Sequence, residues 1–392
     1  MNIRPSFAWL TLPVLVLWLC GPSVQISAAQ QRSSASKTRI YYVAADEVAW
    51  DYAPEGRDVA MDHPFDDFQK NYMESGLHRI GRIYKKAIYR EYTDETFSKL
   101  KMRPPEERYL GLVGPILRGE VGDTIKVIFK NNGTRPFSMH PHGVFYQKDS
   151  EGSSYSDNGS PTDKAGGGVP PGSTHTYIWK IPERAGPGPS DPSSIAWFYH
   201  SHCDEMRDVA SGLVGAIIVT ARGKARPDGR PVDVDIEFVN LFVEFNENLS
   251  WYIDDSIKTY TSDPQGVNKT EFNLGGPDGT VSPFSGTAFV NANWRWSING
   301  YLYGNQPMMS MKKGDRVRWY VGTIADFNNA HTPHWHGNTV LQRGRRVDVI
   351  DINAAEMETV DMIPDDPGIW LYHCHFSEHM VAGMVTRYEV RP

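Results

Sequence analysis

The sequence predicts an all-β fold of two consecutive Greek-key β-sandwich domains. The chain has 392 residues, more than one hydrophobic core usually serves. Glycine and proline are plentiful, at 35 and 27 residues, and aromatic residues make up 12% of the chain. This composition suits many short strands joined by turns. The same order of motifs occurs twice along the chain, which indicates a duplicated domain.

Residues 1–29 have the pattern of a cleaved signal peptide. A positive charge at Arg4 precedes a short apolar core at 7–19, and the small residues at 27–29 offer a cleavage site. The apolar run is too short for a membrane span. We therefore expect a secreted or periplasmic protein with no membrane span. The net charge of −7 without a basic stripe argues against nucleic-acid binding.

The first domain is expected over residues 38–222. Alternating apolar and polar residues predict its strands, and the basic and aromatic segment 79–89 reads as a strand with one solvated face. A segment rich in Gly, Pro and Ser is expected to be a loop that covers one end of the sandwich. The expected strands and this loop are 39–44, 79–89, 122–129, 197–202 and 215–220, with the loop at 149–194.

The second domain is expected over residues 232–392, after a linker at 221–231, and it opens with a strand at 232–238. Its motifs then follow the order of the first domain. The corresponding pairs of segments are 314–320 with 122–129, 334–337 with 140–143, and 373–375 with 200–202.

The stretch 373–384 reads as the last strand and carries the most specific chemistry. Cys374, His379 and Met384 supply a thiolate, an imidazole and a thioether. With one further histidine, they form the donor set of a blue-copper electron-transfer centre. Because side chains alternate along a strand, His373 and His375 should point to the opposite face, towards a second metal site. Cys374 would then be bonded through the backbone to ligands of both sites.

The first domain departs from this pattern. Ser201 stands where the second domain has Cys374, and Met206 stands where it has His379. Because a blue-copper centre requires a thiolate, we expect none in the first domain. Cys203 follows on the wrong face of the strand, and we interpret it as a small buried hydrophobic residue.

Ten of the 13 histidines fall in four short clusters. Histidine pairs at i and i+2 on strands or strand ends can converge on one metal region, and four such pairs give eight imidazoles. Eight imidazoles suit three coppers. The clusters are His140 and His142; His200 and His202; His331, His334 and His336; and His373, His375 and His379.

These four clusters resemble the four signatures of the multicopper oxidases. The segments 79–89 and 92–97 resemble the first domain of ceruloplasmin and hephaestin, as do 210–215 and 367–371. The resemblance covers nearly all of the chain after the signal peptide. It implies two cupredoxin-like domains, the first without a type 1 copper and the second with one.

The resemblance also implies four coppers per chain, with each ligand assigned by its position in a motif. The implied type 1 ligands are His331, Cys374, His379 and the axial Met384. The implied type 2 ligands are His140 and His334, and the implied type 3 ligands are His142, His200, His202, His336, His373 and His375. The implied reaction takes four single electrons from a small reducing substrate and reduces dioxygen to water.

The substrate is the open question. In ceruloplasmin-like ferroxidases, acidic side chains and a histidine hold iron beside the type 1 copper, and Glu378 matches one acidic position as a candidate catalytic residue. Asn291 and Trp296 stand where that pattern has Glu and His. An aromatic wall at Trp294 and Trp296 can stack a phenolic ring, unless these residues pack the core. We therefore expect laccase-like oxidation of phenolic or aromatic substrates, with oxidation of ferrous or another low-valent metal ion as the alternative.

Two other classes share the predicted fold. A copper nitrite reductase is also a two-domain cupredoxin, but its mononuclear catalytic copper does not need eight clustered imidazoles. A non-catalytic cupredoxin binding module has no reason to keep every ligand. Both are less well supported by the histidine clusters than an oxidase.

The resemblance further implies a homotrimer. In the multidomain relatives, the trinuclear cluster forms between the first and last of six domains in a closed ring. Three two-domain chains would close such a ring, with each cluster shared between the first domain of one copy and the second domain of the next.

Overall fold

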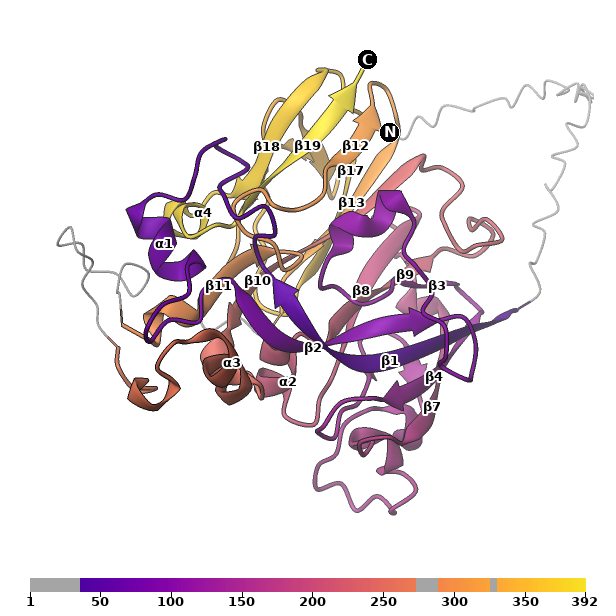
Figure 1. The fold of residues 1–392 in the computed structure, drawn as a ribbon. Helices are drawn as coiled ribbons and strands as arrows, with labels where there is room; N and C mark the ends of the chain where they lie inside the picture. The colour runs from indigo at the N-terminus through magenta and orange to yellow at the C-terminus, as the bar shows by residue number, and fades with distance from the viewer. Residues whose placement is uncertain (1–35, 273–287, 325–329) are drawn as a thin grey trace, which may run out of the picture. The chain divides into compact units, whose positions relative to one another are not determined.

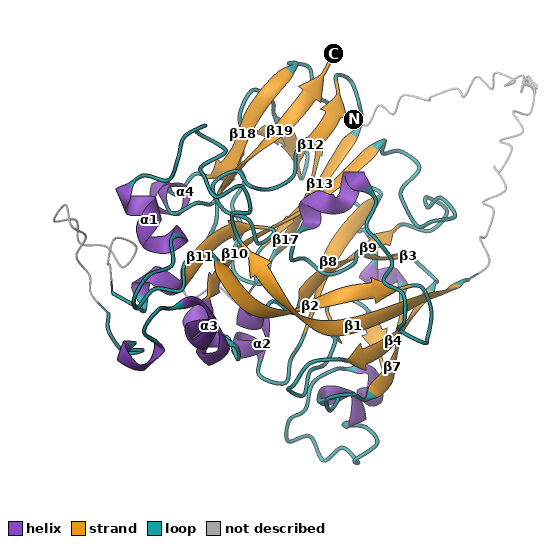
Figure 2. Cartoon of the chain, viewed as in Figure 1, coloured by secondary structure: helices purple, strands orange, loops and turns teal. Residues whose placement is uncertain are grey.

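The computed structural model describes residues 36–272, 288–324 and 330–392. The predicted signal peptide therefore lies outside the described residues. Strands and loops make up most of the described chain (Figure 2), and the all-β prediction is confirmed. Within the described ranges, no helix has both the length and the apolar character needed to cross a membrane.

Two sheets are built from the first part of the chain (Figure 1). One has the order β2 (Ile83–Tyr92), β1 (Thr38–Asp51), β4 (Thr124–Asn131), β7 (Thr174–Lys180) and β6 (Phe145–Tyr146). The other has the order β3 (Leu117–Glu120), β9 (Val214–Thr220), β8 (Ser194–His200) and β5 (His140–Pro141).

Two further sheets are built from the second part of the chain. One has the order β11 (Trp294–Ile298), β10 (Ile236–Asn246), β13 (Val317–Gly322), β17 (Met357–Met362), β15 (Val340–Gln342) and β16 (Arg345–Val347). The other has the order β12 (Met309–Lys312), β19 (Val385–Arg391), β18 (Gly368–Cys374) and β14 (Pro333–Trp335).

The second pair of sheets repeats the topology of the first. In each half, the long first strand pairs antiparallel with the next strand and parallel with a later one, as β1 does with β2 and β4, and β10 with β11 and β13. The final strand of each half likewise lies between a parallel and an antiparallel neighbour. The same strand order therefore arises twice, as the repeated motifs predict.

Within the described residues, four α-helices lie in the connections between strands. They are α1 (Asp67–Met73), α2 (Glu205–Ser211), α3 (Ile253–Tyr260) and α4 (Ser377–Val381). Helices α2 and α4 occupy equivalent places, each directly after the strand that carries the last histidine cluster of its half. The predicted domain limits, 38–222 and 232–392, remain predictions.

One large hydrophobic core contains residues from both halves, among them Tyr84 and Phe198 from the first and Phe242 and Trp319 from the second. An ion pair between Lys86 of β2 and Glu247, both with fully buried side chains, also joins the halves. The expected solvated face of segment 79–89 is therefore wrong at Lys86, whose charge is compensated by burial against a carboxylate.

Three other expectations differ from the structure. The segment 149–194 is not all loop, because it contains β7, which pairs with β4. The first strand of the second half begins at Ile236 rather than 232. The stretch 373–384 is not one strand, because β18 ends at Cys374 and α4 and a turn follow before β19.

Candidate metal centres

His331, Cys374 and His379 converge on one buried point in the second half of the chain. The Nδ1 atoms of His331 and His379 lie 3.1 Å apart. The Cys374 Sγ atom lies 3.8 Å from the His331 nitrogen and 3.5 Å from the His379 nitrogen. All three side chains are buried. His331 is therefore the further histidine that the donor set of Cys374, His379 and Met384 requires.

Local structure explains why these donors meet. Cys374, the last residue of β18, faces Pro333 of β14, and His331 lies just before that strand. The single turn of α4 returns His379 to the end of β18. Met384 is buried, its backbone amide donates to the His379 carbonyl, and its carbonyl accepts from the Cys374 amide.

The donor set fits copper. Nitrogen and sulfur bonds of about 2.0–2.3 Å to a central ion place the ligand atoms roughly 3–4 Å apart. The three measured separations lie in that range. Two imidazoles and a thiolate, with a methionine alongside, are the set that proteins use for blue copper. The amide of Thr332 donates to Cys374 Sγ over 3.4 Å, which stabilises a thiolate.

A second group, formed by His334, His336 and His373, lies on the other face of β18. The Nε2 atom of His373 is 3.2 Å from His334 Nδ1 and 2.9 Å from His336 Nε2. Cys374 and His373 therefore join different groups although they are neighbours in sequence. Strand alternation predicted this placement of Cys374 and His373 in different groups, and metal binding at each group stays a prediction.

A third group, formed by His140, His142 and His200, lies at the equivalent place in the first half. The Nε2 atoms of His142 and His200 are 3.1 Å apart. The His140 ring contacts the rings of both other members, each with ring centroids 5.5 Å apart. Strands β5 and β8 pair His140 with His200, as β14 and β18 pair His334 with His373.

Backbone carbonyls orient several of these rings. Nδ1 of His140 donates to the Glu151 carbonyl over 2.6 Å, and Nδ1 of His373 donates to the Cys374 carbonyl over 2.8 Å. Nδ1 of His200 similarly donates to the Ser201 carbonyl over 3.1 Å. Each bond leaves the Nε2 lone pair free for a metal, the usual arrangement around metal-binding histidines.

Burial keeps the imidazoles neutral. Burial, together with the neighbouring imidazoles, lowers the pKa of His200 and His379 to about 3. The same causes lower the pKa of His142 and His373 to about 4. Neutral imidazole is the form that binds a metal.

Two predicted ligands lie beside these groups rather than inside them. The His202 ring is 5.0 Å from the His140 ring, and its nitrogens contact the Ser153 hydroxyl and the Glu205 carboxylate. His375 is exposed, with its ring 5.2 Å from that of His334.

The counterpart of His379 in the first half is Asp208, and the alignment with Met206 was wrong. The amide of Leu213 donates to the Asp208 carbonyl over 3.2 Å, as the amide of Met384 does to the His379 carbonyl. The first half thus has no thiolate or imidazole at these positions. In place of His331, Cys374, His379 and Met384 it has Phe137, Ser201, Asp208 and Leu213.

Asp208 instead builds a hydrogen-bonded junction. Its buried carboxylate accepts hydrogen bonds from the Ser201 hydroxyl, the backbone amides of Cys203 and Asp204, and the indole of Trp251. Sequence comparison missed this residue because the loop after Ser201 is two residues longer than the loop after Cys374. The interpretation of Cys203 as buried was also wrong, because Cys203 is exposed.

The surroundings of His379 differ from the expected aromatic wall. Trp296 is only 1% exposed, and its ring stacks on the His379 ring with centroids 4.3 Å apart. Trp294 is partly buried, with its ring 6.1 Å from that of Trp296. The exposed side chains beside His379 are instead those of Glu378 and Phe376. The ring centroid of Phe376 lies 5.2 Å from that of His379.

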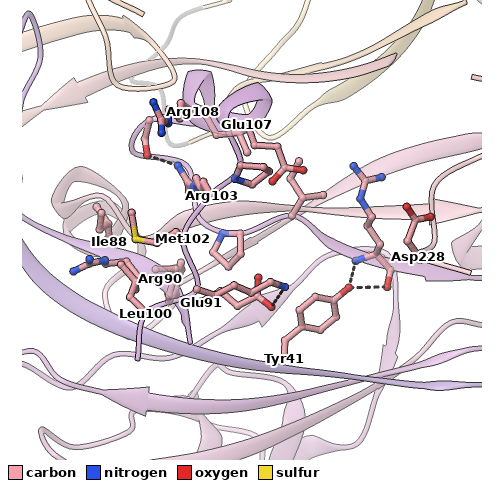
Figure 3. A pocket seen from close by; sticks show the side chains of 18 of the residues that line it. Tyr41, Ile88, Arg90, Glu91, Leu100, Met102, Arg103, Glu107, Arg108 and Asp228 are labelled. Carbon is pink, nitrogen blue, oxygen red and sulfur yellow. Dashed lines mark hydrogen bonds and ion pairs between the residues drawn. The ribbon is translucent and has the colours of Figure 1, made fainter. Parts of the chain in front are cut away.

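The cavity drawn in Figure 3 lies apart from these groups. It has a volume of about 430 Å³ and is lined by residues of β2, the segment 100–118 and the segment 228–230, together with Tyr41. None of the predicted ligands is among these described lining residues. The candidate metal centres therefore lie outside this cavity.

Comparison with known proteins identifies similar sequences. Models of the multicopper oxidase family match residues 111–224 and 278–392. The chain is 40% identical to ferroxidase HEPHL1 of Mus musculus over 356 residues and to hephaestin of Homo sapiens over 358. It is also 40% identical to ceruloplasmin of Homo sapiens over 360 residues. These alignments cover 90% of this chain but only 29–30% of each relative.

Solved structures show the same fold at lower sequence identity. A blue copper oxidase from Nitrosomonas europaea aligns with a TM-score of 0.52 and 16% identity, covering 91% of this chain and 86% of that one. A copper nitrite reductase from the same organism aligns with a TM-score of 0.54 and 16% identity, covering 90% and 94%. The likeness to both classes supports the cupredoxin-like fold and does not distinguish their reactions.

Proposed function

The chain belongs to the multicopper oxidase family, and from that premise we propose that it couples one-electron oxidations of a reducing substrate to the reduction of dioxygen to water. One observation carries the proposal. Cys374 belongs to the buried group with His331 and His379, while the adjacent His373 belongs to the group on the other face of β18. Electrons that enter at the first group thus have a covalent route of a few bonds to the second.

We assign the ligands as the motifs imply, with four coppers per chain. When bound, copper supplies a one-electron acceptor at the first group and the site of dioxygen reduction at the second. The chain itself connects the two groups through its backbone and orients their ligands. The carbonyl of Cys374 accepts a hydrogen bond from His373, which adds a second link between the groups. The Thr332 amide and the burial of Cys374 hold the thiolate in place.

We propose a low-valent metal ion, with ferrous iron first, as the reducing substrate. The relatives include proteins named ferroxidases. Glu378 is exposed beside His379 and offers the hard oxygen donor that a ferrous ion prefers. Trp296, on which the phenol-stacking interpretation rested, is 1% exposed and already stacked on His379, so its face is closed to a substrate.

Phenolic or aromatic oxidation is the second candidate, because Phe376 favours it. This side chain is 46% exposed, and its ring contacts that of His379. A phenol could stack on Phe376 within a short distance of the type 1 ligand. Phe376 thus replaces Trp296 as the residue on which this function depends.

We further propose that the trinuclear cluster is completed between copies in a homotrimer. Each histidine group draws on one half of the chain. Within the chain, one cavity is lined both by His142 and by second-half residues that include Arg343, Met357 and Glu358. The His334 group is not part of that lining, so a second copy is proposed to bring it opposite the His140 group.

Copper loading combined with oxygen uptake tests the proposed function. Copper-reconstituted protein should bind four coppers per chain, show an intense blue absorption, and consume dioxygen with ferrous salt faster than with a panel of phenols. Faster uptake with phenols would favour the second candidate. Copper-loaded protein that consumes no dioxygen with either class of substrate would contradict the oxidase proposal.

A further inference from the structure

Trp296 and His379 form the closest ring stack at the type 1 group. Their planes are inclined by 22°, with centroids 4.3 Å apart. The two residues are 83 positions apart in sequence, and β11 and α4 bring them together. On β11, Trp296 pairs with Glu244 of β10, so its backbone is held by a sheet rather than by a loop.

This stack has two physical consequences for His379. A rigid indole against one face restricts rotation of the imidazole, which must present Nδ1 to the point shared with His331 and Cys374. The indole also keeps water from that face, and His379 is 4% exposed. A dry environment disfavours the more highly charged oxidised state of a metal relative to the reduced state.

We propose that Trp296 is a positioning residue that raises the reduction potential of the type 1 centre through its stack on His379, and thereby selects which reductants the protein can oxidise. This inference rests on the proposed function, because it requires copper at the His331, Cys374 and His379 group. The specificity for substrates then depends on Trp296, a buried side chain that contacts His379 but no substrate. Phe376 and Glu378, on the exposed side, then act on binding rather than on potential.

The test compares Trp296→Leu and Trp296→Phe with wild type in copper-loaded protein. Leucine retains an apolar residue but removes the stack, and phenylalanine retains a smaller ring. Redox titration of the blue absorption should give a lower potential for Trp296→Leu, with Trp296→Phe between it and wild type. The blue band should shift in the same order, because the orientation of His379 changes. Trp179→Leu, which removes a fully buried tryptophan from the first half, should leave both quantities unchanged.

The possible failures are distinguishable. Wild type that binds copper without a blue absorption would overturn the proposed function itself. A blue Trp296→Leu protein with the wild-type potential and band would overturn only the role of Trp296. If Trp296→Leu does not fold, Trp296→Phe decides by the same two measurements, since an unchanged potential and band there would contradict the inference.

Discussion

The Ser201 hydroxyl donates a hydrogen bond to the Asp208 carboxylate over 2.7 Å. These two residues occupy the places that Cys374 and His379 occupy in the other half of the chain. One half thus closes this position with a hydrogen-bonded carboxylate, and the other leaves a thiol and two imidazoles converging on one point. This asymmetry is why the proposed electron-entry site is assigned to the second half of the chain and not to the first.

Stability should depend on pH through Asp208. Burial raises the pKa of this carboxyl above its ordinary value. The folded state then holds the proton more tightly than the unfolded state, so the stability due to this group falls as the pH rises from about 4 through the raised pKa. Asp208→Asn should abolish this contribution. Denaturant unfolding of copper-free protein across this pH range measures it, with the exposed Asp67→Asn as control. Parallel pH profiles for wild type and Asp208→Asn would contradict the prediction.

Replacing the proposed bridging thiolate should remove one copper. Cys374→Ser should lose the blue absorption and oxygen uptake and bind three coppers per chain instead of four, because a hydroxyl is a poor ligand for this site. Cys203→Ser is the matched control and should retain all three properties. Metal analysis and absorption spectroscopy are the measurements. A blue, active Cys374→Ser protein would disprove the assignment.

Glu378 and Phe376 should affect different substrates. Glu378→Gln should lower kcat/KM for ferrous iron roughly tenfold, equivalent to about 1.4 kcal/mol of lost stabilisation, with a smaller effect on phenols. Phe376→Ala should show the reverse preference. Steady-state kinetics with both substrates on both variants decides the matter. Equal losses of kcat/KM for the two substrates in each variant would indicate a shared role, such as holding His379. Such a result would contradict separate roles for Glu378 and Phe376.

Breaking the buried ion pair between the halves should be costly. Lys86 and Glu247 are fully buried, and Lys86→Met would leave a buried carboxylate without its cation. The expected loss of unfolding free energy is about 3–5 kcal/mol. The double variant Lys86→Met/Glu247→Gln should lose less than the sum of the single variants. Lys70→Met, at an exposed ion pair, is the control and should change little. Additive losses in the double variant would show that the two groups are not coupled.

Mixing two inactive variants should test the shared cluster. His200→Ala disables the first-half group and His336→Ala the second-half group. If clusters form between copies, co-assembled trimers contain some interfaces with both intact groups. Random assembly of equal amounts gives about one interface in four, so roughly a quarter of wild-type oxygen uptake should return. Light scattering confirms that the mixed trimers have formed. If such trimers recover no oxygen uptake, or if a monomer is active at high dilution, both histidine groups of a cluster come from one chain.

The donor types and their local spacing can be read directly from the amino-acid sequence. The histidines at i and i+2 around Ser201 and Cys374 depend on backbone periodicity over a few residues. Such short-range patterns predicted the all-β fold, the duplication and the placement of Cys374 and His373 in different groups. The resemblance carried by the same clusters added His331 as the partner of His379.

The residues that surround these donors are distant in sequence, and the packing of the folded chain brings them together. Twelve positions separate Ser201 from Leu213, whereas ten separate Cys374 from Met384, and backbone hydrogen bonds place Asp208 rather than Met206 opposite Ser201. Trp296 was expected to line a substrate site, but it is buried and stacked on His379, because β11 places it against α4. Lys86 is buried because Glu247, far along the chain, neutralises it. Burial and pairing are properties of packed elements, so they follow from long-range contacts that local periodicity does not encode.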